Sequence, residues 1–155
     1  MLVLCLSFVI AALDQFTKYV VRNQFFPGEV LPVVRGFLNL TYVRNTGAAW
    51  GVFDGFNRWL AALSVLVLAL MLIFHRTLFT GGRVQRAALG LMVGGIVGNL
   101  LDRVRLAFVV DFLDFHSGVH HFPSFNVADA AICTGVGLYV LSSLWLSRRA
   151  SAAQP

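Results

Sequence analysis

The sequence predicts an all-α membrane protein with four transmembrane helices and a small extracytoplasmic β-containing segment. Of the 155 residues, 58% are hydrophobic and only 12% are charged, whereas a soluble domain carries about a quarter charged residues. The mean hydropathy is +0.78, and four apolar runs approach the roughly twenty residues that a helix needs to cross a bilayer. The length allows a single integral membrane domain, residues 1–155, without a separate soluble module.

The first two predicted spans differ in their polar content. The first covers about residues 2–21 and contains Asp14, Gln15 and Lys18. We expect a retained helix rather than a signal peptide, because no basic segment precedes the apolar run and no clear cleavage site follows it. Asp14 and Lys18 are four residues apart, so on a helix they can neutralise each other. The second span, about residues 59–74, is apolar without interruption.

The third and fourth spans complete the predicted bundle. They cover about residues 87–101 and 128–146. The third carries small residues at four-residue intervals, a pattern that lets a neighbouring helix approach closely in lipid; these are Gly90, Gly94 and Gly98, with Gly95 beside them. Cys5 and Cys133 fall at different depths of the predicted bundle, so we expect no disulfide between them.

The connections between the spans are unequal. The link between the second and third spans is short and basic, whereas residues 23–58 and 103–127 form longer extracytoplasmic segments. Within the first of these, residues 32–43 (PVVRGFLNLTYV) combine β-branched and aromatic side chains with partial alternation. This pattern predicts one or two short strands.

Polar residues gather toward one membrane face. At ~1.5 Å per residue, Asp14 lies roughly 18 Å along the first helix, past the bilayer centre. Asn99 and Asp102 end the third span, and Asn126 and Asp129 begin the fourth. The other halves of the spans contain almost no ionisable residue, so the chain lacks the polar path that a transporter or proton relay needs.

The charge distribution bears on topology and partners. The net charge is +5, but the twelve basic residues are spread thinly, which argues against nucleic acid and for contact with anionic lipid headgroups. Four spans put both termini on one side. The basic link after the second span and Arg148 and Arg149 favour a cytoplasmic location for the termini. The polar residues then face outward.

Asp111 and Asp129 are the candidate catalytic residues, at either end of the polar connection. Asp111 lies in VVDFLDF, an apolar setting that disfavours the charged form of its carboxyl group. Two carboxylates brought together share a proton, so that one activates water and the other donates to a carbonyl oxygen. Such a pair can hydrolyse an amide without a metal ion.

Structural roles compete with this interpretation. Asn126 and Asp129 have the spacing of a helix capping box, and Asp102 with Arg103 can form a satisfied pair at a helix end. A non-enzymatic membrane scaffold, in which such acids only cap helices and pair with Arg103 and Lys18, is therefore a second hypothesis.

A metal-dependent hydrolase is a third hypothesis. His116, His120 and His121 lie between the two acids and, with Asp111 and Asp114, could surround a metal ion. The sequence has no HExxH motif, and the loop contains Gly118, so ordinary loop histidines are favoured. We expect no metal and no cofactor. No serine stands in a nucleophile-elbow context either.

Five sequence blocks carry a resemblance to a known family. The chain resembles bacterial lipoprotein signal peptidase, also called signal peptidase II, over nearly its whole length. The blocks, in order, are DQFTKYVV at 14–21, YVRNTGAAWG at 42–51, GGIVGNLLDRV at 94–104, VVDFLDF at 109–115 and FNVADAAI at 125–132.

The resemblance implies an aspartic endopeptidase of the bacterial cytoplasmic (inner) membrane. Such an enzyme removes the signal peptide from diacylglyceryl-modified prolipoproteins and cuts on the amino side of the lipidated cysteine. Its catalytic pair corresponds to Asp111 and Asp129, the two acids selected above. Its active site faces the periplasmic or outer side, in agreement with the orientation inferred here.

The resemblance also implies residues that bind the substrate or support the site. They are Asn45, Asn99, Asp102, Arg103, Asn126, Ala128, Asp14 and Lys18. We expect a monomer whose partners are the diacylated prolipoprotein and membrane lipids. The segment around Asn45 is expected to cover the site and exclude bulk water.

Overall fold

The computed structural model describes residues 1–48, 52–80 and 82–152. Four of its helices are long and apolar enough to cross a membrane, which confirms the predicted fold class. They are α1 (Leu2–Gln24), α2 (Asn57–Leu78), α3 (Gly82–Leu106) and α4 (Val127–Ala152). Each extends beyond the predicted span because the polar residues that flank the apolar run are helical as well.

Helix α3 is the centre of the bundle and packs most extensively against α4 and α1. Its glycines make these contacts possible. A Cβ atom at Gly94 would lie 2.7 Å from the Ser7 carbonyl oxygen of α1. One at Gly95 would lie 2.7 Å from Ile132 Cγ1 of α4. The predicted close packing along this glycine face is therefore confirmed.

Helix α2 is peripheral. It packs against α3 and leaves large apolar side chains such as Leu63, Leu66 and Leu72 exposed. In a membrane these side chains would contact lipid, so their exposure carries no cost there.

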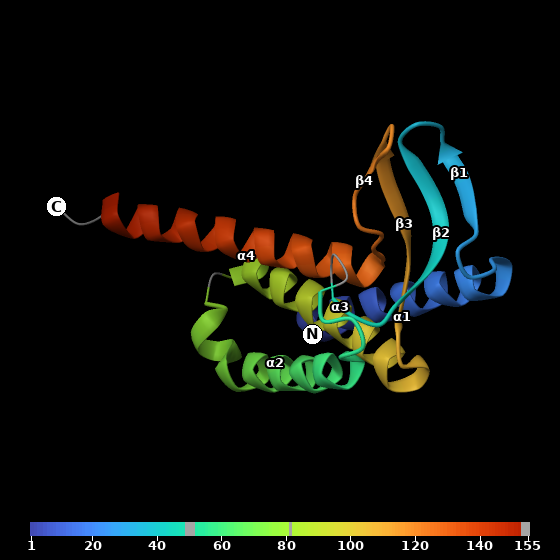
Figure 1. Ribbon diagram of the computed structural model, residues 1–155. Coiled ribbons are helices and arrows are strands. Elements are labelled where there is room, and N and C mark those ends of the chain that lie inside the picture. Colours follow the sequence, from blue (N-terminus) through green and yellow to red (C-terminus); the bar gives the residue numbers. More distant parts are fainter. Residues whose placement is uncertain (49–51, 81, 153–155) are drawn as a thin grey trace.

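A four-stranded antiparallel sheet stands at one end of the helices, as Figure 1 shows. Its order is β1 (Val30–Val34), β2 (Leu38–Asn45), β3 (Val109–Ser117) and β4 (His120–His121). The first two strands confirm the prediction from residues 32–43. The third was not predicted, and it carries Asp111.

The sheet joins the bundle through a small apolar core. Val21 near the end of α1, Tyr42 on β2, and Val110 and Phe112 on β3 are buried together. The connection between α2 and α3 and the carboxyl end of α4 lie at the opposite end of the molecule (Figure 1). The carboxyl end of α1, the carboxyl end of α3 and the amino end of α4 therefore meet beneath the sheet.

Candidate functional site

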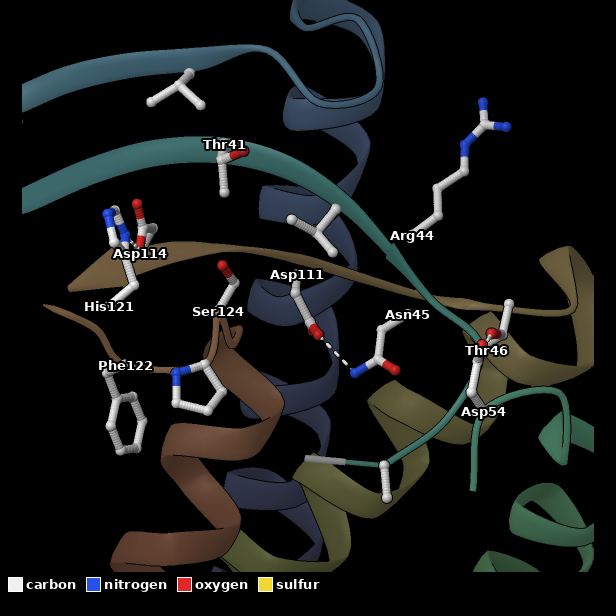
Figure 2. A pocket seen from close by; sticks show the side chains of 14 residues that line it. Thr41, Arg44, Asn45, Thr46, Asp54, Asp111, Asp114, His121, Phe122 and Ser124 are labelled. Carbon is white, nitrogen blue, oxygen red and sulfur yellow. Dashed lines mark hydrogen bonds and ion pairs between the residues drawn. The ribbon is translucent and has the colours of Figure 1, made fainter. Parts of the chain in front are cut away.

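Asp111 is held on β3 by amide side chains. The strand pairs with β2, in the register Val43 to Asp111. This register brings Asn45, two residues further along β2, close enough for its Nδ2 to donate to Asp111 Oδ2 at 2.8 Å (Figure 2). Only 2% of Asp111 is exposed, so bulk water does not solvate its carboxyl group.

Asn126 connects Asp111 with Asp129 at the amino end of α4. The Asp129 N–H donates to Asn126 Oδ1 (3.0 Å), and the Asn126 N–H donates to Asp129 Oδ2 (3.2 Å). These two bonds form the predicted capping box. Asn126 Nδ2 also donates to Asp111 Oδ1 at 2.7 Å. The same residue therefore caps the helix and holds both carboxyl groups.

Asn99 on α3 binds the second carboxyl group. Its Nδ2 donates to Asp129 Oδ1 at 2.7 Å. Its Oδ1 accepts from Lys18 Nζ at 2.8 Å and from Asn126 Nδ2 at 3.2 Å. With these three bonds the amide has a fixed orientation, with its NH₂ group toward Asp129.

Behind Asn99 lies a buried ion cluster formed by α1 and α3. Lys18 Nζ lies 2.9 Å from Asp14 Oδ2 and 3.1 Å from Asp102 Oδ2. The predicted pair of Asp14 and Lys18 is confirmed. Asp102 also accepts from the Val110 N–H of β3 at 3.0 Å, so the cluster ties the sheet to both helices.

Two further contacts position α4. The Ala128 N–H donates to Asp14 Oδ1 at 2.9 Å, and Ala128 is fully buried. Gly98 gives the carboxylate room, because a Cβ there would lie 2.5 Å from Asp14 Oδ2. Sequence reasoning noted Gln15 but gave it no role. Its Nε2 donates to the Gly98 carbonyl at 3.1 Å and to Asp102 Oδ1 at 2.9 Å.

The alternative in which Asp102 and Arg103 form a pair is not what the structure shows, because Asp102 pairs with Lys18 instead. Consecutive helical residues point about 100° apart, so Asp102 turns to Lys18 while Arg103 turns toward the cavity. Arg103 Nη2 donates to the Gly47 carbonyl at 3.2 Å, and its Nε has no hydrogen-bond partner among the described residues.

The two candidate acids line one cavity of about 390 Å³. Apolar residues of β3, the segment before α4 and α4 itself form most of its remaining wall. They include Val109, Phe122, Phe125, Ala130 and Ile132, and Asn45 and Arg103 also border it. A second cavity of about 700 Å³ lies next to it against the sheet (Figure 2).

The electrostatics of the site favour a protonated Asp111. Burial, and next the negative charge of Asp129, raise the pKa of Asp111 to about 7. Hydrogen bonds from Asn45 and Asn126 oppose this shift. A carboxyl group with such a pKa can hold a proton at neutral pH and donate it.

The histidines lie apart from the two acids, at the β3–β4 hairpin. His121 Nδ1 contacts Asp114 Oδ1 at 2.8 Å, and the His116 ring stacks on His121 with centroids 4.9 Å apart. Within residues 1–48, 52–80 and 82–152, no three His, Cys, Asp or Glu residues are grouped to hold a metal ion. Cys5 and Cys133 are free and exposed.

The comparison with known proteins assigns the family. A family model described as "Signal peptidase (SPase) II" matches residues 6–145. The chain belongs to the signal peptidase II family. The lipoprotein signal peptidases of Desulforapulum autotrophicum and Moorella thermoacetica are each 43% identical to it, over 88% and 86% of both chains, respectively. That of Symbiobacterium thermophilum is 38% identical over 98% of this chain and 100% of its own.

Solved structures match the fold of the chain. Two bacterial membrane enzyme structures, determined by the in meso method at 2.3 and 1.9 Å resolution, match with TM-scores of 0.83 and 0.80. Each is 30% identical to this chain and covers 92% of it, and the matches span 87% and 92% of those chains. The protein is therefore a multi-pass membrane peptidase.

Most residues that the resemblance selected lie together. Asp14, Lys18, Asn45, Asn99, Asp102, Asp111, Asn126, Ala128 and Asp129 are linked by the hydrogen bonds and ion pairs above, and Arg103 borders their cavity. Thr46 borders the second cavity, and Ala48 borders both. The end of the block at 42–51, residues 49–51, lies outside the described residues.

Proposed function

We propose that the protein is an aspartic endopeptidase that removes the signal peptide from diacylglyceryl-modified prolipoproteins, cutting on the amino side of the lipidated cysteine. One observation carries this proposal. Asp111 and Asp129 border the same cavity and are both bonded to Asn126, while Asp111 has a pKa of about 7. Carboxyl groups that share a proton are the chemical requirement of a metal-free aspartic peptidase.

In the proposed reaction, Asp129 is the base and Asp111 the acid. Asp129 takes a proton from a water molecule, whose oxygen bonds to the carbonyl carbon of the scissile amide. Asp111 donates its proton to the carbonyl oxygen, giving a neutral tetrahedral intermediate. The C–N bond then breaks, the amine leaves with a proton from Asp129, and Asp111 recovers its own proton from the new carboxylic acid group.

The supporting residues act through these two acids. Asn45 and Asn126 hold the Asp111 carboxyl group by its two oxygens. Asn99 holds Asp129, and Asn99 is itself oriented by Lys18. In this proposal Asp14, Asp102 and Ala128 fix Lys18 and the start of α4. Arg103, which borders the smaller cavity, binds the substrate backbone.

The membrane setting suits a lipidated substrate. Diacylation confines the substrate to the bilayer, so its scissile amide reaches the interface, where the sheet meets the helix ends. The apolar wall of the smaller cavity can shelter the lipid or the signal peptide. We place the protein in the bacterial cytoplasmic membrane, as one domain and one monomer, with the cavity on the outer side.

The test is cleavage of a lipid-modified prolipoprotein by the purified protein, with and without EDTA. We expect cleavage in both conditions and loss of at least about three orders of magnitude in rate for Asp111→Asn and for Asp129→Asn. Glu29→Gln, which removes a carboxylate outside both cavities, is the matched control and should cleave normally. Near-normal turnover by either Asn variant would remove that residue from the mechanism.

The same experiment separates the other hypotheses. A rate that EDTA abolishes and zinc restores would support the histidine metal site. A folded protein that binds but never cleaves the lipidated substrate would support a scaffold.

A further inference from the structure

The two cavities meet at the proposed reaction centre. Six residues line both cavities, namely Asn45, Ala48, Asp111, Phe122, Pro123 and Ser124. We call the larger cavity the sheet groove. A substrate whose scissile amide contacts Asp111 therefore has one cavity on each side of the bond to be cut.

The surroundings of the cavities differ. The smaller cavity reaches Ala130, Ile132 and Cys133 of α4, within a membrane span. The sheet groove instead reaches Thr41 and Val43 of β2 and continues along β3 and β4, outside the spans. An apolar signal peptide fits the bilayer side, which leaves the sheet groove for the polar chain that follows the cut.

The far end of the sheet groove carries a fixed negative charge. Asp114 Oδ2 accepts from Asn39 Nδ2 at 2.9 Å, and its Oδ1 contacts His121 Nδ1 at 2.8 Å. Burial raises the pKa of Asp114, but the hydrogen bonds from Asn39 and His121, together with the charges of His121 and His116, outweigh that effect and hold the pKa below its ordinary value. The carboxylate is therefore ionised at neutral pH.

His121, which also lines the sheet groove, pairs with Asp114 and neutralises it only when its ring is protonated. The remaining charges of the sheet groove do not neutralise Asp114. Asp54 adds a second carboxylate to the groove wall, hydrogen-bonded to Thr46. The Arg44 guanidinium lies over the rings of Tyr42 and Phe108, 5.5 and 5.2 Å from their centroids. Figure 2 shows the Arg44 side chain pointing away from Asp111 and Asp114.

We propose that the sheet groove binds the first residues of the mature chain and that Asp114 makes it favour a cationic over an anionic side chain there. This inference rests on the proposed function. Asp114 lies three positions after Asp111 on the same strand, a distance of roughly 10 Å. An extended substrate covers the same distance in about three residues, so the preference falls on the third mature residue, counting the lipidated cysteine as the first.

The test compares lipopeptides with Lys, Gln or Glu as the third mature residue, at pH 7 and low salt. For the unmodified protein we expect the Lys peptide to be cleaved about three- to tenfold more efficiently than the Glu peptide, as the small measured energies of solvent-facing ion pairs imply. Asp114→Asn should remove most of this preference and leave the Gln peptide within about twofold of its original rate. Glu29→Gln, which removes a carboxylate outside the groove, should keep the ratio.

Two further measurements test the inference even if the Asp114→Asn variant does not fold. Asp54→Asn should reduce the ratio in part, and high salt should reduce it for the unmodified protein because ions screen the charged substrate side chain that enters the groove from solvent. A ratio near one in the unmodified protein, or an unchanged ratio in a folded Asp114→Asn variant, would overturn the inference. If the unmodified protein does not cleave even the Gln peptide, the proposed function is overturned instead.

Discussion

At the scale of single residues, Asn126 joins two roles that are usually separate. It caps α4 through its backbone N–H and Oδ1, and it donates to Asp111 through Nδ2. From the sequence alone, helix capping and catalysis are competing explanations for Asn126 and Asp129. In the structure the cap is what places Asp129 beside Asp111, so the structural role supports the proposed chemical one.

The raised pKa of Asp111 predicts how the cleavage rate depends on pH. If Asp111 is the acid, the rate should fall as pH rises through about 7, because the group then loses the proton that it donates. Above that pH we expect a fall of about tenfold per pH unit. The measurement is kcat/KM for a neutral lipopeptide between pH 5 and 9, and a rate that rises across pH 7 would contradict the assignment of acid and base.

Asn45 and Arg103 should matter less than the two acids. Neither group can supply the acid or the base, since an amide does not titrate and a guanidinium stays protonated. Hydrogen bonds to charged groups contribute roughly 1.5 to 3 kcal/mol, so Asn45→Ala and Arg103→Ala should each cut cleavage efficiency by about one to two orders of magnitude. Rate against lipopeptide concentration measures this. Folded variants as inactive as Asp111→Asn would show that the division of roles is wrong.

The family resemblance supplied the site roles of most of these residues, but some residue types are also out of place in apolar helices. Asp14, Lys18 and Asp102 are costly to bury without partners. The partners were harder to predict. Lys18 binds Asn99, 81 positions away, and no local pattern indicates such a contact. The same limit explains why Asp102 was paired with its neighbour Arg103.

At the scale of elements, the packing of α3 against α4 sets the distance between Asn99 and Asp129. Gly95→Ala should disturb it, because the new Cβ would meet Ile132 Cγ1 at 2.7 Å and the backbone of Ala128. Overpacking of this kind costs about 1–3 kcal/mol. We expect a lower melting temperature in detergent and slower cleavage. Gly137→Ala is the matched control, since its Cβ would meet nothing within 4 Å, and equal effects of both changes would contradict this account.

The helices and strands were predicted correctly where the local residue pattern is sufficient to indicate them. Long apolar runs sufficed for all four helices, and residues 32–43 gave β1 and β2. Strand β3 was not predicted because acids and histidines interrupt its apolar residues. Residues 109–117 were therefore interpreted as part of a polar connection. Its pairing with β2 joins residues such as Asn39 and Asp114 that are 75 positions apart, so the sheet exists only through tertiary contact.

At the scale of the whole molecule, the sheet and the proposed dyad lie at one end of the bundle and the α2–α3 connection at the other (Figure 1). This arrangement predicts a testable orientation. With Cys5 and Cys133 replaced by Ala, a cysteine at Val119, which is 88% exposed, should react from outside the cell with an impermeant reagent. A reporter fused after Arg149 should behave as cytoplasmic. The reverse pattern would overturn the orientation and leave the proposed chemistry untouched.

The position of Asn126 in the chain also has a consequence for biosynthesis. A ribosome delivers Asp111 to the membrane before it has made Asn126 or Asp129, so a nascent chain with three helices holds only one of the two acids. The second arrives with the last helix, and the cap forms only when that helix has begun to coil. If the two acids act as proposed, a half-inserted protein lacks the second of them, and proteolytic activity begins only when the bundle is complete.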